Sequence, residues 1–141
     1  SDNFYIFRIP QLFGDFFLHK TLINYIYKCI EHNHNFSVYD NAYRYVIEIN
    51  DVRKLVEAYL NSHEPRMTVD LANPYRYRVL DIVHAFEDIL CKKAQYDLVE
   101  KDDQYVLDLR PMLSFIKARN LRFNFGPDYL VKKISDKLRK K

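Results

Sequence analysis

The sequence predicts an α+β fold in which helices pack on one or two β-hairpins. Apolar residues make up 48% of the chain, which is enough for a hydrophobic core and argues against disorder. Several segments carry apolar residues at helical spacing, and two others alternate apolar and polar residues as strands do. The 141 residues fit one domain, so we expect residues 1–141 to fold around a single core.

Helix start signals divide the chain into helical segments. Proline is favoured in the first turn of a helix, because backbone N–H groups have no partner within the helix there and proline has none to leave unpaired. Asparagine can cap a helix start with its side chain. Together with apolar spacings of three and four, these signals predict helices over residues 11–30, 50–60, 74–93, 111–117 and 127–141. The first of these segments also fits two helices with a break near residues 19–21. The helix at 74–93 is the clearest, because Asn73 and Pro74 precede a long apolar face on which we expect Phe86 to be buried.

Two segments alternate about a polar centre and predict β-hairpins. Residues 36–49 alternate about Asp40 and Asn41, although residues 42–49 also fit a helix. Residues 96–109 alternate about Lys101-Asp102-Asp103, and every second residue from Tyr105 to Leu109 is expected to face the core. Residues 67–71 alternate over a short strand or an extended link.

The composition excludes several functional classes. The chain has only two glycines, too few for a loop that cradles phosphate through its backbone. A net charge of +3 permits nucleic-acid binding without demanding it. Cys29 and Cys91 lie far apart within apolar helical stretches, where we expect both to be buried in a reducing compartment. No secretory leader or membrane-spanning run is expected.

No set of residues resembles a catalytic or metal site. His32 and His34 share a polar segment, but a stable metal site needs further ligands. His84 is one helical turn from Asp81 and from Asp88, without a nucleophile motif nearby. We therefore predict a protein that is not an enzyme and that uses no metal, no cofactor and no small-molecule substrate.

Basic residues indicate a possible nucleic-acid surface. Arg76 and Arg78 alternate with tyrosines, a pattern that can grip phosphates and stack on bases, or that can simply point arginine to solvent. The C-terminal helix carries Lys132 and Lys133 beside an apolar stripe. This helix can dock on its own domain, on a partner or on DNA phosphates.

The aromatic content indicates an exposed apolar patch. The 12 Tyr and 10 Phe exceed what one small core needs, and exposed patches commonly mark partner surfaces. We expect a homodimer interface formed by Leu121, Phe123, Phe125, Leu130 and Ile134. In the alternative, Phe123 and Phe125 fold back onto the first helix.

The order helix, hairpin, short helix over residues 79–117 resembles a known family. The segments VLDIVHAF, YDLVEKDDQYVLDL and MLSFIK resemble the C-terminal winged helix of the AAA+ origin-recognition initiators and their silent-information-regulator paralogue. The resemblance implies a winged-helix-like domain that serves as a homodimerisation module of a nuclear chromatin or silencing protein. Its implied partners are a second copy and other chromatin proteins, with DNA as a further partner in the alternative function, but no membrane. The alternative function is a winged-helix or single-strand-binding domain that contacts nucleic acid.

Overall fold

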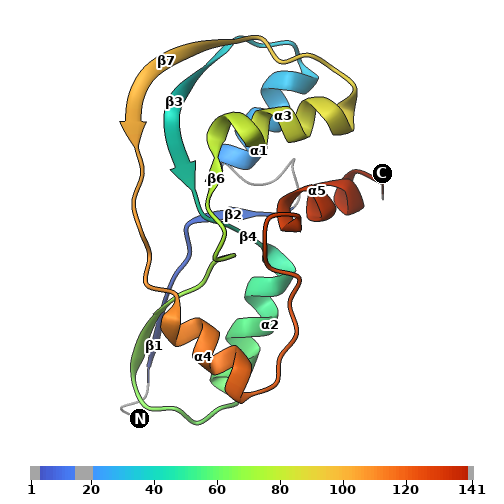
Figure 1. Ribbon diagram of the computed structural model, residues 1–141. Helices are drawn as coiled ribbons and strands as arrows, with labels where there is room; N and C mark the ends of the chain where they lie inside the picture. The colour runs from blue at the N-terminus through green and yellow to red at the C-terminus, as the bar shows by residue number, and fades with distance from the viewer. Residues whose placement is uncertain (1–3, 15–20, 140–141) are drawn as a thin grey trace.

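A computed structural model describes residues 4–14 and 21–139 of the chain. Strands and helices alternate along it, and α5 lies between an upper and a lower group of elements (Figure 1). The strands are β1 (Tyr5–Arg8), β2 (Gln11–Phe13), β3 (Phe36–Arg44), β4 (Val46–Glu48), β5 (Met67–Asp70), β6 (Tyr77–Arg78) and β7 (Tyr96–Asp103). The helices are α1 (Leu22–Glu31), α2 (Ile49–Leu60), α3 (Val79–Leu90), α4 (Arg110–Ala118) and α5 (Tyr129–Arg139).

The described strands pair mainly in parallel and between distant parts of the chain. β1 pairs with β5, and β2 pairs with β4, both in parallel. β3 pairs with β7 in parallel and with β6 in antiparallel orientation, in the order β6-β3-β7. Parallel strands need a crossover connection, and α2 supplies part of the crossover between β1 and β5.

Both predicted hairpins are wrong. Asp40 and Asn41 do not turn the chain but lie inside β3, where the pairing with β7 shifts register between Tyr39 and Asn41. Asp102 and Asp103 likewise lie inside β7, and residues 104–109 form no strand. Alternation and polar residues at the centre could not identify a turn, because an exposed strand edge tolerates the same charged residues.

Two predicted helix starts are also wrong. The chain after Pro10 forms β2, so the helix start predicted there is wrong, whereas the second of the two alternative helices is found as α1 from Leu22. Residues 15–20, on which the prediction partly falls, lie outside the described range. Asn73 and Pro74 precede α3 by several residues, because the Asn73 side chain accepts the Tyr75 N–H in a local turn instead of capping a helix. The helices predicted at 50–60 and 111–117 are confirmed as α2 and α4, and the helix predicted at 127–141 is confirmed as α5 over Tyr129–Arg139. Residues 140–141 lie outside the described range.

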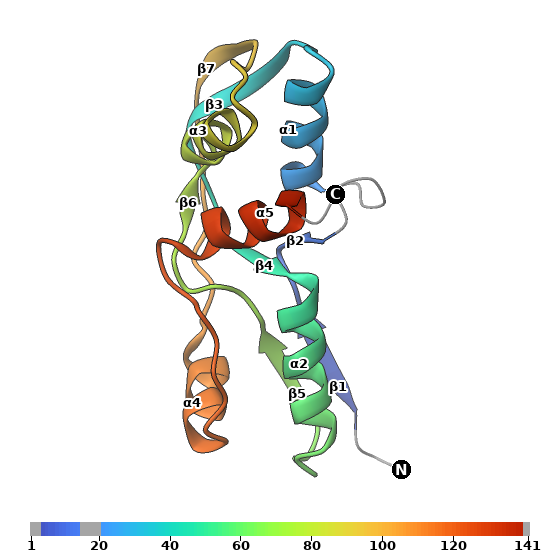
Figure 2. The ribbon, with the colours of Figure 1, turned by 90° about the vertical axis from the view of Figure 1, so that its right-hand side faces the viewer.

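The core consists of two hydrophobic clusters, not the single one that was expected. The upper cluster joins α1, α3, α5 and β3, and it contains Phe86, whose predicted burial is confirmed. The lower cluster joins α2, α4 and β5 around Leu55 and Tyr59. Phe125 packs against both clusters. Figure 2 shows the two groups stacked end to end, with α5 between them.

The two cysteines have different environments. Cys29 is buried in the upper cluster as predicted, whereas Cys91 is exposed. Cys91 follows α3 with a φ of 54°, so its backbone turns away from the helix and leaves the side chain outside the core. No helix of the described residues is long and apolar enough to cross a membrane.

Tyr59 is expected to be replaceable by Phe without loss of stability. Its ring stacks on Phe115 with centroids 3.7 Å apart, but its buried hydroxyl has no hydrogen-bond partner among the described residues. Removing an unpaired hydroxyl deletes a desolvation cost, so Tyr59→Phe should leave the free energy of unfolding at pH 7 unchanged or raise it by about 1 kcal/mol. Urea denaturation measures this, and a loss above about 1 kcal/mol would contradict it.

The same substitution should reduce the alkaline sensitivity of the fold. Burial, with a smaller effect of Glu64, raises the pKa of Tyr59 to about 12 from 10.0. Because the folded-state pKa is raised, the stabilisation is fully present below pH 10 and is lost as the pH rises through about 12. Denaturation midpoints for the Tyr59→Phe variant should therefore fall less between pH 10 and pH 12 than those of the original chain.

Candidate functional site: a pocket at the ends of two parallel strands

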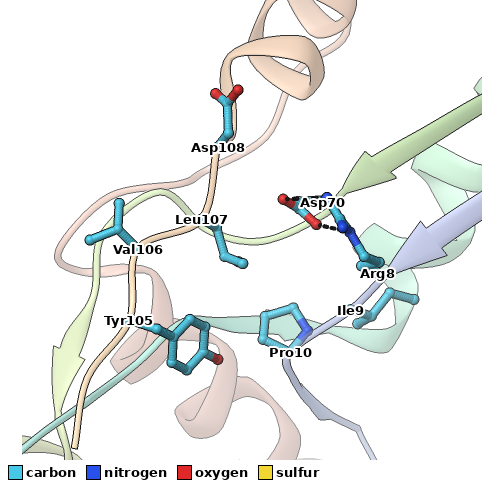
Figure 3. Close-up of a pocket in the computed structure, with 8 residues that line it drawn as sticks. All are labelled: Arg8, Ile9, Pro10, Asp70, Tyr105, Val106, Leu107 and Asp108. Carbon is cyan, nitrogen blue, oxygen red and sulfur yellow. Dashed lines mark hydrogen bonds and ion pairs between the residues drawn. The ribbon is translucent and has the colours of Figure 1, made fainter.

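A pocket of about 450 Å³ opens where β1 and β5 end. Three segments form it: the end of β1 with the residues that follow, the end of β5, and the extended chain between β7 and α4. Figure 3 shows its lining residues, which are Arg8, Ile9, Pro10, Asp70, Tyr105, Val106, Leu107 and Asp108. In open α/β sheets, ligands bind outside the carboxyl ends of parallel strands, which is where this pocket lies.

An ion pair between Arg8 and Asp70 forms the polar wall of the pocket. The two residues are register partners at the last position of β1 and β5. Arg8 donates from Nε to Asp70 Oδ1 at 2.7 Å and from Nη2 to Oδ2 at 3.3 Å, which is the bidentate geometry of a strong pair. Asp70 is 5% exposed whereas Arg8 is 64% exposed. The buried carboxylate therefore holds an accessible guanidinium whose Nη1 is not used by these bonds.

Tyr105 forms the opposite wall. Its ring lies 5.8 Å from that of Tyr45, whose hydroxyl accepts the backbone N–H of Leu107 and so orients this segment. In Figure 3 the Tyr105 ring points toward Pro10. Burial raises the pKa of Tyr105, an effect that the nearby Arg44 partly offsets. Tyr105 is therefore a neutral phenol at physiological pH, able to donate or accept one hydrogen bond.

Asp108 lines the pocket, but its carboxylate is bound by Arg110 rather than directed at the cavity. Arg110 donates to it from its side chain and from its backbone, and these hydrogen bonds lower the pKa of Asp108. In Figure 3 the Asp108 side chain points away from Arg8 and Tyr105. The Asp108 carboxylate is thus ionised and engaged outside the cavity.

The arrangement suits binding of an anionic ligand with an apolar body. The guanidinium of Arg8 offers a charge-assisted donor, the phenol of Tyr105 offers a neutral polar contact, and Ile9, Pro10 and Leu107 supply apolar surface. No group of three or more His, Cys, Asp or Glu able to hold a metal occurs among the described residues. Sequence reasoning missed Arg8 and Asp70, because they are more than 60 residues apart and no local motif joins them.

The basic residues predicted to contact nucleic acid lie in different environments. Arg78 donates two hydrogen bonds to the Asp40 carbonyl, and Arg76 lies over the Tyr43 ring. Lys132 is exposed, whereas the Nζ atom of Lys133 lies 3.4 Å from Oδ2 of Asp51 in an ion pair. Arg78 and Lys133 are therefore engaged within the fold, and the structure does not join the four residues into one surface.

The residues predicted to form a dimer interface pack within this chain. Leu130 and Ile134 are buried in the upper cluster, so α5 docks on its own fold. Leu121, Phe123 and Phe125 are half-buried against the lower cluster, and the Phe123 and Phe125 rings stack with centroids 5.0 Å apart. The apolar surface that suggested an interface is thus largely covered by the chain itself. The homodimer and the nuclear location stay predictions.

No protein-family model matches the chain, and no curated protein matches it. Solved structures do match. A UDP-N-acetylglucosamine 4-epimerase from Methanobrevibacter ruminantium has a TM-score of 0.76 and 12% identity, covering 97% of this chain and 45% of that one. The dTDP-glucose 4,6-dehydratase of Bacillus anthracis, in complex with NAD, has a TM-score of 0.75 and 11% identity, covering 97% and 44%. A UDP-galactose 4-epimerase has a TM-score of 0.69 and 18% identity, covering 96% and 45%.

These similarities correct the resemblance drawn from the sequence. The predicted winged-helix fold is wrong, because the structural neighbours are nucleotide-sugar epimerases and dehydratases. The same neighbours contradict the predicted chromatin-silencing and DNA-binding functions and the expectation of a protein that is not an enzyme. The winged-helix interpretation depended on the hairpin at residues 96–109, which does not exist. The chain spans less than half the length of these neighbours. It has the fold of part of a Rossmann-like epimerase or dehydratase.

Proposed function

We propose that this chain forms the nucleotide-sugar-binding part of an NAD-dependent epimerase or dehydratase. One observation carries the proposal: nearly the whole chain, 96–99% of it, superposes on a little under half of enzymes whose names include UDP-sugars, dTDP-glucose and NAD. A fold shared over such a length indicates a common origin or a common architecture. Because a fold can serve several functions, the assignment also needs support from the site.

The sequence favours the nucleotide-sugar-binding part of such an enzyme over its NAD-binding part. A dinucleotide-binding turn uses three glycines within six residues, so that the backbone can approach the pyrophosphate. This chain has only Gly14 and Gly126, which are more than 100 residues apart. The described sequence therefore lacks the glycine spacing of such a turn, which favours the nucleotide-sugar-binding part over the dinucleotide-binding part.

The pocket at the ends of β1 and β5 fits the proposed substrate class. A nucleotide sugar carries a diphosphate and, in uronic acids, a carboxylate, and both are anions that a guanidinium binds well. Arg8 is accessible and held in place by Asp70, so little side-chain entropy is lost when it binds an anion. Pro10 and Tyr105 offer apolar surface on which a ring can rest.

Titration of the chain with nucleotide sugars tests the proposal. We expect saturable chemical-shift changes with UDP-glucose, UDP-glucuronic acid or dTDP-glucose at millimolar concentrations, and none of comparable size with NAD or with free glucose. Arg8→Gln should weaken binding by about 10- to 100-fold, because a charge-assisted hydrogen bond contributes about 1.5–3 kcal/mol. Arg53→Gln removes an equal charge from an exposed position on α2 and should leave the affinity unchanged.

A second variant separates binding from folding. Arg8→Gln alone leaves the Asp70 carboxylate buried without its partner, which destabilises the fold. Arg8→Gln combined with Asp70→Asn replaces the ion pair by two amides that can hydrogen-bond to each other, and it should fold and still bind weakly. The proposed function would be overturned if none of the three nucleotide sugars showed saturable binding. Full affinity in the folded double variant would remove Arg8 from the site.

A further inference from the structure

A second pocket, of about 530 Å³, opens between the end of α2, the start of β5 and one face of α4. Figure 1 shows these three elements in the lower group. The lining residues are Tyr59, Glu64, Met67, Pro111, Ser114, Phe115, Ala118 and Arg119. This pocket shares no lining residue with the pocket at Arg8 and lies at the other end of β5, since Met67 is the first residue of that strand and Asp70 the last. Pockets that bind small molecules have volumes of about 300–1,000 Å³, so the second pocket can hold a small ring compound.

Tyr59 brings an unused hydrogen-bonding group to this second pocket. Its backbone carbonyl accepts the N–H and the hydroxyl of Ser62, and its ring stacks on Phe115. Its hydroxyl, in contrast, is buried without a hydrogen-bond partner among the described residues. Buried polar groups in folded proteins are nearly always hydrogen-bonded, and exceptions are expected mainly where a protein binds or reacts. The Tyr59 hydroxyl is therefore a group that a ligand in this pocket can use.

The charged side chains of the second pocket balance each other. Arg119 Nη2 lies 3.4 Å from Glu64 Oε1, and the two side chains are 40% and 42% exposed. The Arg119 guanidinium also lies over the Phe115 ring, 5.2 Å from its centroid. An exposed ion pair at this distance contributes little to stability, so both side chains can move aside and admit a ligand to the buried hydroxyl. A charged ligand would meet the like charge of Arg119 or of Glu64, so the pair favours an uncharged one.

We propose that the second pocket binds an uncharged aromatic compound that carries a carbonyl group, such as an aromatic amide. Met67, Pro111 and Ala118 supply apolar surface for the ring. Burial, with a smaller effect of Glu64, raises the pKa of Tyr59 to about 12, so its hydroxyl is protonated at neutral pH and can donate to the carbonyl. The expected result that Tyr59→Phe does not lower stability agrees with a hydroxyl that serves binding rather than folding. This site does not depend on the nucleotide-sugar pocket.

Titration of the chain with benzamide, followed by nuclear magnetic resonance, tests this site. We expect saturable chemical-shift changes at the backbone amides of Tyr59, Ser114 and Phe115 at millimolar concentrations, and none of comparable size at Arg8 or Asp70. Benzoate and benzylamine carry a similar ring with a negative and a positive charge. Each should bind about fivefold more weakly than benzamide, because a like charge near the ligand opposes binding by about that factor.

Two variants locate the bound benzamide. Tyr59→Phe should weaken its binding about two- to tenfold, because it removes one neutral hydrogen bond, while the free energy of unfolding is not lowered. Ala118→Leu places a larger side chain in the pocket from an exposed position on α4 and should abolish saturable binding. Lys117→Leu is the matched control: it adds the same side chain to the same helix outside the pocket and should leave the affinity unchanged.

Three results would each overturn the proposed site: no saturable change with benzamide, full affinity in Tyr59→Phe, or full affinity in Ala118→Leu. Equal binding of benzoate or benzylamine would overturn the assignment to an uncharged ligand. Ala118 does not line the pocket at Arg8, so Ala118→Leu should bind UDP-glucose as the original chain does. Failure of the benzamide site and failure of the proposed function are thus distinguished.

Discussion

Replacing Phe86 with Ala is expected to lower the free energy of unfolding by about 3–5 kcal/mol. Phe86 is completely buried in the upper cluster, and its ring lies 5.9 Å from that of Tyr27 on α1. Truncation removes apolar surface from the core and leaves a cavity, because the packed residues of α1 and α3 can close in only partly. Urea denaturation followed by circular dichroism measures the change.

A matched control shows that the effect comes from burial. Leu113 on α4 is 43% exposed, and Leu113→Ala should cost less than about 1 kcal/mol because the site already contacts water. Equal losses for the two variants would contradict the assignment of Phe86 to the core. A loss of this size at Phe86 is a large part of the stability of a typical domain, so the unfolding of the variant is measured at low temperature. 

Replacing Asn73 with Ala is expected to cost about 3 kcal/mol through hydrogen bonds rather than through packing. Asn73 is fully buried, and its amide forms a clasp between the end of the lower cluster and the loop before α5. Oδ1 accepts the Gly126 N–H at 2.9 Å, and Nδ2 donates to the Gly126 carbonyl at 3.0 Å and to the Tyr77 hydroxyl at 3.2 Å. Alanine would leave these groups buried without that partner.

The backbone conformation of Gly126 explains why the hydrogen bonds of Asn73, which form this clasp, stabilise the loop. Gly126 has a φ of 136°, a conformation that other residues rarely adopt, and Asn73 pairs both its N–H and its carbonyl. Asn124→Ala is the control, because Asn124 is exposed in the same loop and should change stability by less than about 0.5 kcal/mol. Thermal denaturation compares the two, and a change at Asn73 no larger than at Asn124 would contradict the role of the clasp.

The helices show what local sequence can predict. α2, α4 and α5 lie close to their predicted ranges, because each has an apolar face at helical spacing and a start signal nearby. Asn73 misled the prediction of α3 because its side chain accepts the Tyr75 N–H in a local turn and also bonds to the distant Gly126, which no local pattern reveals.

The strands show what local sequence cannot predict. β3 carries an alternating pattern that fits a hairpin equally well, and only its pairing with β7, some 60 residues later, decides the topology. The pocket has the same origin: Arg8, Asp70 and Tyr105 come from three separate segments, and the parallel register of β1 and β5 brings the first two together.

The sequence by itself determined the positions of three helices, the burial of Phe86 and the lack of a glycine-rich phosphate loop, since helical periodicity, capping and glycine count are local properties. Tertiary structure alone decided which strands pair, in which direction, and hence the fold shared with the epimerases and dehydratases. Strand pairing joins residues far apart in the chain, and the energy that selects a partner lies in contacts that exist only after folding.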